Sequence, residues 1–203
     1  MHKILELTGC PLSAGMRRFY YPNKQMMMVQ VQLGDVYVTS QRELISTVLG
    51  SCISTCIWDP CVALGGMNHF MLPFGDENNI KEWDPSQWRS HAARYGNYAM
   101  ELLVNTMIQQ GAVKDRLRIK LFGGGFVIEN KVRIGNENII FILDYVASEE
   151  LIVISRDLGN VYPRKVIFDP MTGQAWVKKL RGYYNNMEIR ENYYNDCLVN
   201  ETK

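Results

Sequence analysis

One cysteine and one histidine in this sequence lie in apolar segments that also carry glycine. Cys52 ends the run Leu49-Gly50-Ser51-Cys52, and His69 stands within Gly66–Pro73. A cysteine thiol has an ordinary pKa of about 8.5, so it is mostly protonated at neutral pH and becomes a useful nucleophile only beside a base such as imidazole. The pair therefore predicts thiol chemistry, with Cys52 as the nucleophile and His69 as its base.

Strand pairing offers a way to bring the two side chains together. Residues 52–58 and 65–72 are both short apolar runs, and Asp59-Pro60-Cys61 lies between them. If these runs form an antiparallel pair, the start of the first run lies beside the end of the second. Cys52 and His69 are then neighbours.

Two glycine-containing segments bear on this chemistry. Gly50 allows the backbone to approach a substrate closely, and the amide N–H groups of Ser51 and Cys52 are then candidates for an oxyanion site. The triple glycine Gly123–Gly125 is more typical of a turn or a strand bulge than of a phosphate cradle, because it lacks the lysine and the hydroxyl residue of a P-loop.

Two other interpretations of these residues stay open. Cysteine is often buried, and Cys52 and Cys56 share one face of the expected strand, so both could be core residues and His69 a buried histidine. Cys52, Cys56, Cys61 and His69 also have a spacing that superficially resembles a zinc site. Geometry argues against zinc, because Cα atoms four residues apart on a strand are about 13 Å apart, whereas thiolates on one zinc lie within about 4 Å. No metal is expected.

Composition limits the classes of protein to consider. With 203 residues and 47% hydrophobic content, the chain can bury one sizeable core. The formal net charge of +1 gives no sign of binding to nucleic acid or to an anionic membrane. No segment approaches the roughly 20 apolar residues of a membrane span, and an odd number of cysteines, five, argues against a disulfide framework. We expect a cytoplasmic protein without membrane insertion.

Hydrophobic alternation and short apolar runs together predict many short strands. The expected strands are residues 29–33, 36–38, 44–49, 52–58, 63–72, 117–122, 151–154, 165–168 and 175–180. Residues 29–33 lead through the turn Gly34-Asp35 into 36–38, which predicts a hairpin. Residues 165–168 are expected to pair with 175–180 across a turn that contains proline and glycine.

Two helices and one long loop complete the expected domain. Residues 91–110 have a period of 3.6 with Gly111 as a stop signal. A second helix is expected after Asn136, burying Ile139, Ile140, Leu143 and Val146. The loop 74–90 could be a lid or binding loop that anchors a partner through Trp83 and Trp88, or a structural flap at the core edge.

These elements predict an α+β fold, a layered α/β sandwich with mostly antiparallel strands and two main helices. Residues 1–25 are expected to form an N-terminal arm and residues 26–181 the folded domain. Residues 182–203 form a polar, tyrosine-rich tail.

Six ordered blocks also carry a resemblance to a known family: Thr47–Cys52, Trp58–Pro60, Gly66–Pro73, Phe122–Gly125, Ile134–Asn138 and Asp157–Gly159. They resemble the CheD family, the chemoreceptor glutamine deamidases of bacterial chemotaxis, from about Val29 to Leu180. The resemblance implies an α/β sandwich of the type found in the deamidase domains of cytotoxic necrotizing toxins, which agrees with the elements above.

The resemblance also implies roles for individual residues. The family's nucleophile falls on Cys52 and its histidine on His69. The third member is a threonine shortly before the cysteine, for which Thr47 is the natural match. Ser46 is the alternative, because the spacing differs by one residue among relatives. Asn68, beside His69, is a further residue expected to contact substrate, together with the two loop tryptophans.

The activity implied by the resemblance is the conversion of glutamine to glutamate on methyl-accepting chemotaxis receptors, through a thioester and without a metal or organic cofactor. A CheC-type phosphatase is an implied partner. Two alternatives stay open: an adaptor that binds receptors or a CheC-type phosphatase without turnover, and a thiol hydrolase that acts on receptor methyl esters. The presence of Cys52, His69 and a preceding hydroxyl favours the enzyme.

Overall fold

The computed structural model describes residues 12, 15–72, 85–126 and 132–180, with the backbone alone for 85–94 and 132–133. In these described residues, ten strands form two five-stranded sheets. In order across the sheet, the first contains β1 (Arg17–Tyr21), β2 (Met26–Gln30), β4 (Glu43–Leu49), β9 (Arg164–Phe168) and β10 (Ala175–Lys179). The second contains β3 (Val36–Thr39), β6 (Leu64–Asn68), β5 (Ile53–Asp59), β7 (Arg118–Gly123) and β8 (Ile152–Leu158). We call them sheet A and sheet B.

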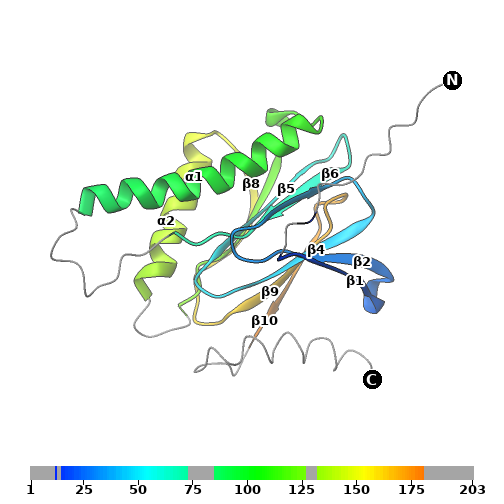
Figure 1. Cartoon of the computed structure of the whole chain (residues 1–203), viewed down its shortest axis with the longest axis horizontal. Helices are drawn as coiled ribbons and strands as arrows, with labels where there is room; N and C mark the ends of the chain where they lie inside the picture. The colour runs from blue at the N-terminus through cyan, green and yellow to red at the C-terminus, as the bar shows by residue number, and fades with distance from the viewer. Residues whose placement is uncertain (1–11, 13–14, 73–84, 127–131, 181–203) are drawn as a thin grey trace.

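Helices α1 (Pro85–Gln109) and α2 (Val132–Ser148) cover sheet B on the side away from sheet A (Figure 1). Short 3₁₀ turns occupy Pro22–Lys24 and Lys114–Arg116. Within the described residues, the strand pairs β2·β4 and β7·β8 are parallel and the other six are antiparallel. The predicted α+β sandwich with mostly antiparallel strands is therefore confirmed.

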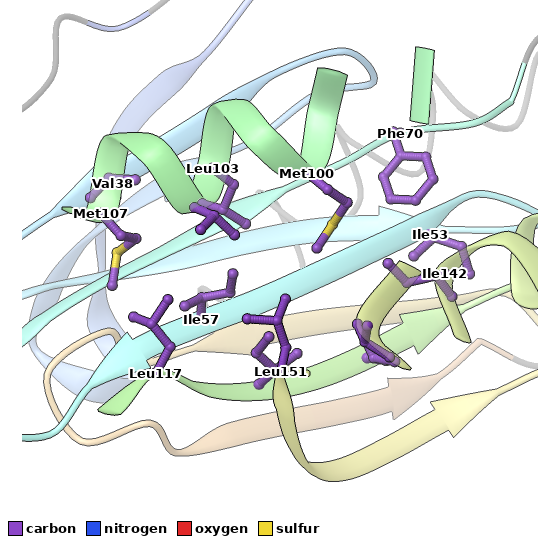
Figure 2. Close-up of a cluster of buried hydrophobic side chains, with 14 of the residues drawn as sticks. Val38, Ile53, Ile57, Phe70, Met100, Leu103, Met107, Leu117, Ile142 and Leu151 are labelled. Carbon is purple, nitrogen blue, oxygen red and sulfur yellow. The ribbon is translucent and has the colours of Figure 1, made fainter. Parts of the chain in front are cut away.

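Two hydrophobic clusters hold the three layers together. The first lies between the helices and sheet B, where Met100 and Leu103 of α1 and Ile142 of α2 lie over Ile53 and Ile57 of β5 (Figure 2). The second lies between the two sheets, with Val29, Ile45, Leu49, Val166 and Phe168 from sheet A and Tyr37, Cys56, Trp58, Met67 and Phe122 from sheet B. Strand β5 is buried on both faces, which explains why its apolar residues, Ile53, Cys56, Ile57 and Trp58, do not alternate with exposed polar residues.

The hairpin predicted at Gly34-Asp35 is wrong. Strands β2 and β3 do form, but β2 pairs with β1 and β4 in sheet A, whereas β3 pairs with β6 in sheet B. A turn closed by hydrogen bonds between Gln32 and Asp35 carries the chain from one sheet to the other. Alternation identified the strands, but it carries no information about which strand each one pairs with.

The helix boundaries differ from the prediction. Helix α1 begins at Pro85, so residues 85–90 of the expected loop are helical, and proline is well suited to a first helical position because its N–H is not needed there. On α2, Ile140 is 54% exposed and its predicted burial is wrong. The buried face instead includes Ile142 and Val146, with Ile139 and Leu143 partly buried.

The ends of the described chain add one strand to the expected domain. Residues 17–21, within the predicted arm, form β1 and pair with β2. Strands β9 and β10 pair antiparallel, as the sequence predicts for residues 165–168 and 175–180. The predicted tail, 182–203, lies outside the described residues.

Candidate active site

The pairing of β5 with the end of the β6 segment places Cys52 and His69 on one face. Ile53 and Phe70 form a bridge with N–H to C=O distances of 2.8 and 2.9 Å, and both side chains belong to the cluster under the helices. Successive side chains on a strand point to opposite faces, so Cys52 and His69 face sheet A. In this register the two are diagonal neighbours, a relation with a typical separation of about 7–8 Å. The predicted antiparallel pairing is confirmed.

The hydroxyl group of a threonine in sheet A contacts the imidazole of His69. Thr47 Oγ1 of β4 lies 2.8 Å from His69 Nδ1 and also donates a hydrogen bond to the carbonyl of Val31, at 2.9 Å. A hydroxyl has one hydrogen, so a threonine that donates to Val31 accepts from His69. The neutral imidazole then carries its proton on Nδ1, which leaves Nε2 as the basic nitrogen.

Ser46, the alternative hydroxyl, precedes Thr47 on the same strand. Adjacent residues of a strand project from opposite faces, so the Ser46 side chain points away from the inter-sheet space. Of these two hydroxyls, the structure brings Thr47 to His69. Both side chains are buried, so burial alone does not separate them.

The segment between β2 and β3 holds the histidine from the main-chain side. The N–H of His69 donates to the carbonyl of Asp35 at 3.1 Å, and the His69 carbonyl accepts from the N–H of Gly34 at 2.8 Å. Val31, which anchors the Thr47 hydroxyl, lies at the beginning of the same segment. The segment between β2 and β3 therefore fixes the positions of both His69 and Thr47.

The triple glycine braces the backbone on either side of the cysteine. Gly125 N–H donates to the carbonyl of Gly50, and Gly124 N–H donates to the carbonyl of Cys52, both at 2.8 Å. Gly123 has φ +117°, and a Cβ there would lie 2.0 Å from the Cys52 carbonyl oxygen. Only glycine allows the two segments to approach this closely. The triple glycine, which begins at the last residue of β7, thus supports the backbone of residues 50–52 directly; we call residues 50–52 the Cys52 loop.

Asn138 is a site residue that the sequence analysis did not single out by itself. Its Nδ2 donates to the carbonyl of Ser51 at 2.8 Å, and its Oδ1 accepts from the N–H of Leu72 at 2.9 Å. The residue is fully buried. One signal was present in the sequence, because Asn138 interrupts an otherwise apolar stripe on α2, four residues from both Ile134 and Ile142.

Comparison with known proteins identifies the family of this chain. A family model described as CheD chemotactic sensory transduction matches residues 71–179. A protein of Vibrio vulnificus (strain CMCP6), named probable chemoreceptor glutamine deamidase CheD, is 45% identical over 186 residues, which cover 91% of this chain and 87% of the relative. The chain belongs to the CheD family. Proteins with the same name from Hahella chejuensis and Hydrogenovibrio crunogenus are CheD relatives at 41% and 44% identity, covering 93% and 84% of this chain and 87% and 86% of the relatives.

In this CheD-family chain, the two buried cysteines of the β5 region have different surroundings. Burial raises the pKa of the Cys56 thiol, with smaller opposing effects from Lys120 and Ser54, so Cys56 stays protonated at neutral pH. Cys56 is completely buried, whereas Cys52 is 3% exposed and His69 is 7% exposed. The core interpretation therefore fits Cys56, and the assignment of the nucleophile to Cys52 stays a prediction.

Of the three residues expected to contact substrate, Asn68 is the one whose side chain lies in the described part of the chain, and it points away from Cys52 and His69. Asn68 accepts from the N–H of Thr55 at 2.8 Å and donates to the carbonyl of Ala99 in α1 at 3.2 Å, so its carboxamide faces the helix layer. Trp88 lies near the beginning of α1, and Trp83 lies outside the described residues.

Neither α1 nor α2, within the described parts, is long and apolar enough to cross a membrane.

Proposed function

We propose that this chain converts glutamine side chains of chemoreceptors to glutamate, through a thioester on Cys52. Two observations support the proposal. The relatives described above are named as probable chemoreceptor glutamine deamidases. Cys52 and His69 share one face of sheet B, and Thr47 contacts His69 Nδ1, which is consistent with a thiol hydrolase. We place this activity in the cytoplasm, where the receptor's signalling helices are the expected substrate.

In the first half of the reaction, His69 takes the proton of the Cys52 thiol. The thiolate attacks the carboxamide carbon of the glutamine side chain, and the negative charge moves to the carboxamide oxygen. Backbone N–H groups around Ser51 and Cys52 stabilise this oxyanion. The C–N bond then breaks, the imidazolium gives its proton to the leaving nitrogen, and ammonia departs from the thioester.

In the second half, water replaces ammonia. His69 removes a proton from a water molecule, and the resulting hydroxide attacks the thioester carbon. The C–S bond breaks, His69 returns its proton to the departing Cys52 thiolate, and the new carboxylic acid releases its proton to solvent. The products are a glutamate carboxylate and the Cys52 thiol, and no electrons enter or leave. Thr47 accepts from Nδ1–H in both the neutral imidazole and the imidazolium, and so orients the ring as the third group of a catalytic triad does.

The hydrogen bond between Thr47 and His69 is the observation that carries this proposal. Any buried histidine needs a hydrogen-bond partner, but a hydroxyl whose hydrogen is already given to a carbonyl can only accept from the imidazole. Here the Val31 carbonyl takes the threonine hydrogen, which leaves the hydroxyl oxygen able to accept from Nδ1. The arrangement keeps Nε2 basic, which is what deprotonation of a thiol requires.

The test is to replace Cys52 with alanine and to incubate the variant with a receptor cytoplasmic fragment. Mass spectrometry of receptor peptides detects the change from NH₂ to OH, and an ammonia assay follows turnover. Loss of the nucleophile should reduce the rate by several orders of magnitude. Cys61→Ala is the matched control, because Cys61 is exposed and lies beyond the other end of β5.

The outcomes separate the alternatives. Unchanged conversion by Cys52→Ala would overturn the proposed nucleophile. Receptor binding by the wild-type chain without release of ammonia would instead support the adaptor, and methanol release from methylated receptors would support the methyl-ester hydrolase. A CheC-type phosphatase stays a predicted partner, and binding of purified components with and without the Cys52→Ala change would test it.

A further inference from the structure

Three successive carbonyl groups around the proposed nucleophile are held by three different donors. The carbonyls of Gly50 and Cys52 accept from backbone N–H groups of the triple glycine. The carbonyl between them, that of Ser51, accepts from the side chain of Asn138 on α2. Through the Asn138 side chain, helix α2 therefore contacts the peptide group between Ser51 and Cys52.

That peptide also contains the Cys52 N–H group. In a trans peptide, the carbonyl of one residue and the N–H of the next lie in one plane and point in opposite directions. The described chain has no cis peptide bonds. A hydrogen bond that fixes the Ser51 carbonyl therefore also fixes the direction of the Cys52 N–H, which points away from α2.

The other end of the carboxamide contacts the segment that follows the histidine. Oδ1 of Asn138 accepts from the N–H of Leu72, three residues after His69. The planar carboxamide of Asn138 thus links the residue before Cys52 to the segment that follows His69. Because the group is fully buried, water does not compete for either bond, and both are kept in one geometry.

We propose that Asn138 is a positioning residue that aims the Cys52 N–H at the oxyanion formed during turnover. The inference rests on the proposed deamidation. A donor that is already aimed before the reaction costs no reorganisation when charge develops, and loss of one such donor typically lowers kcat by about 10²–10³-fold. Asn138 does not touch substrate and acts through the Ser51–Cys52 peptide.

The chemistry of the carboxamide suggests a sharp test, which is the variant Asn138→Asp. An ionised aspartate has acceptors only, and it would repel the Ser51 carbonyl that Asn138 now holds. A protonated aspartate has one donor and one acceptor, so it reproduces both bonds. Burial raises the pKa of such a carboxyl group above its usual value of about 3.9. The kcat of Asn138→Asp relative to wild type should therefore rise as pH falls.

Two further variants control the experiment. Asn136→Asp adds the same charge to an exposed position of α2, and its kcat relative to wild type should not depend on pH. Asn138→Leu keeps the approximate shape and removes both bonds, so its kcat should be low at every pH, with KM little changed. The leucine variant also keeps the test open if the aspartate variant does not fold at neutral pH.

Alkylation of Cys52 by iodoacetamide, followed by peptide mass spectrometry, gives a second measurement. This reaction needs the thiolate but no oxyanion site, so it should proceed at the wild-type rate in Asn138→Leu. Wild-type kcat in Asn138→Leu, or a pH-independent ratio for a folded Asn138→Asp, would overturn the inference while deamidation by wild type stands. A wild-type chain no more active than Cys52→Ala would overturn the proposed function and this inference together.

Discussion

The hydroxyl of Thr47 and the imidazole of His69 come from different sheets, yet the atoms Oγ1 and Nδ1 lie 2.8 Å apart. The geometry of the proposed site therefore depends on how sheet A packs against sheet B. Small shifts between packed layers would change this distance directly. The dense cluster between the sheets, which includes Ile45, Trp58 and Phe168, opposes such shifts.

The first prediction concerns this hydrogen bond. Thr47→Ala removes the acceptor that holds His69 Nδ1–H, so the imidazole loses its preferred orientation and tautomer. We expect kcat for receptor deamidation to fall by about 10²-fold or more, within the range that general acid–base catalysis contributes. Thr47→Ser, which retains the hydroxyl, should recover much of the loss.

Ser46→Ala is the matched control, because Ser46 is buried on the opposite face of the same strand. It should change kcat little. A larger loss for Ser46→Ala than for Thr47→Ala would transfer the orienting role to Ser46. Wild-type rates in both variants would mean that another group holds the imidazole.

The second prediction concerns the close contact between Gly123 and the Cys52 carbonyl group. Gly123→Ala places a Cβ against the Cys52 carbonyl oxygen at a backbone angle that disfavours side chains. The Cys52 loop must move, so deamidation should be almost lost. Gly111 also has a positive φ, +102°, but a Cβ there meets nothing within 4 Å.

Gly111→Ala therefore separates backbone strain from the clash. Thermal melts should show a modest loss of stability for Gly111→Ala, about 1 kcal/mol, with activity retained. Equal activity losses in folded samples of the two glycine variants would show that the contact with the Cys52 carbonyl is unimportant.

Local patterns predicted much of this site. Alternation and length identified the strands that carry Thr47 and precede His69, and the pairing of residues 52–58 with 65–72 followed from their spacing. The pairing of β2 and β3 with other strands could not be predicted, because a strand's pattern shows that one face is buried but not which strand lies beside it. Asn138 acts across a large sequence separation, and no local pattern specifies its partners Ser51 and Leu72.

The third prediction concerns stability below neutral pH. The Asp59 carboxylate is buried and accepts from Arg116 and from the N–H groups of Cys61 and Val113. Burial alone would raise the pKa of Asp59, but these bonds outweigh it and lower that pKa below its usual value. Asp59 thus stabilises the fold above about pH 4, and this contribution is lost as pH falls through the folded-state pKa.

Asp59→Asn should lower the free energy of unfolding by about 2 kcal/mol at neutral pH, as expected for lost charge-assisted hydrogen bonds. Thermal melts between pH 3 and 7 should also show a weaker fall in Tm toward acid for the variant than for wild type. Glu149→Gln, at the exposed Lys114–Glu149 pair, should cost about 0–1 kcal/mol. Parallel Tm curves for wild type and Asp59→Asn would contradict the assignment.

The fourth prediction concerns recognition of the receptor. Trp83 and Trp88 are residue types that anchor partners well, because they bury a large area with few rotatable bonds. Trp83→Ala and Trp88→Ala should raise KM for a receptor fragment while the alkylation rate of Cys52 stays at the wild-type value. Equal losses of deamidation and alkylation would show instead that the tryptophans support the fold.

The segment between β2 and β3 serves the site through main-chain atoms, namely the carbonyls of Val31 and Asp35 and the N–H of Gly34. Main-chain groups are the same whichever side chain a residue carries. Substitutions at Gln32 or the exposed Leu33 should therefore be tolerated during evolution, whereas inserting or deleting a single residue would displace every one of these bonds. We therefore expect positions 32 and 33 to tolerate substitution better than the segment tolerates a change in its length.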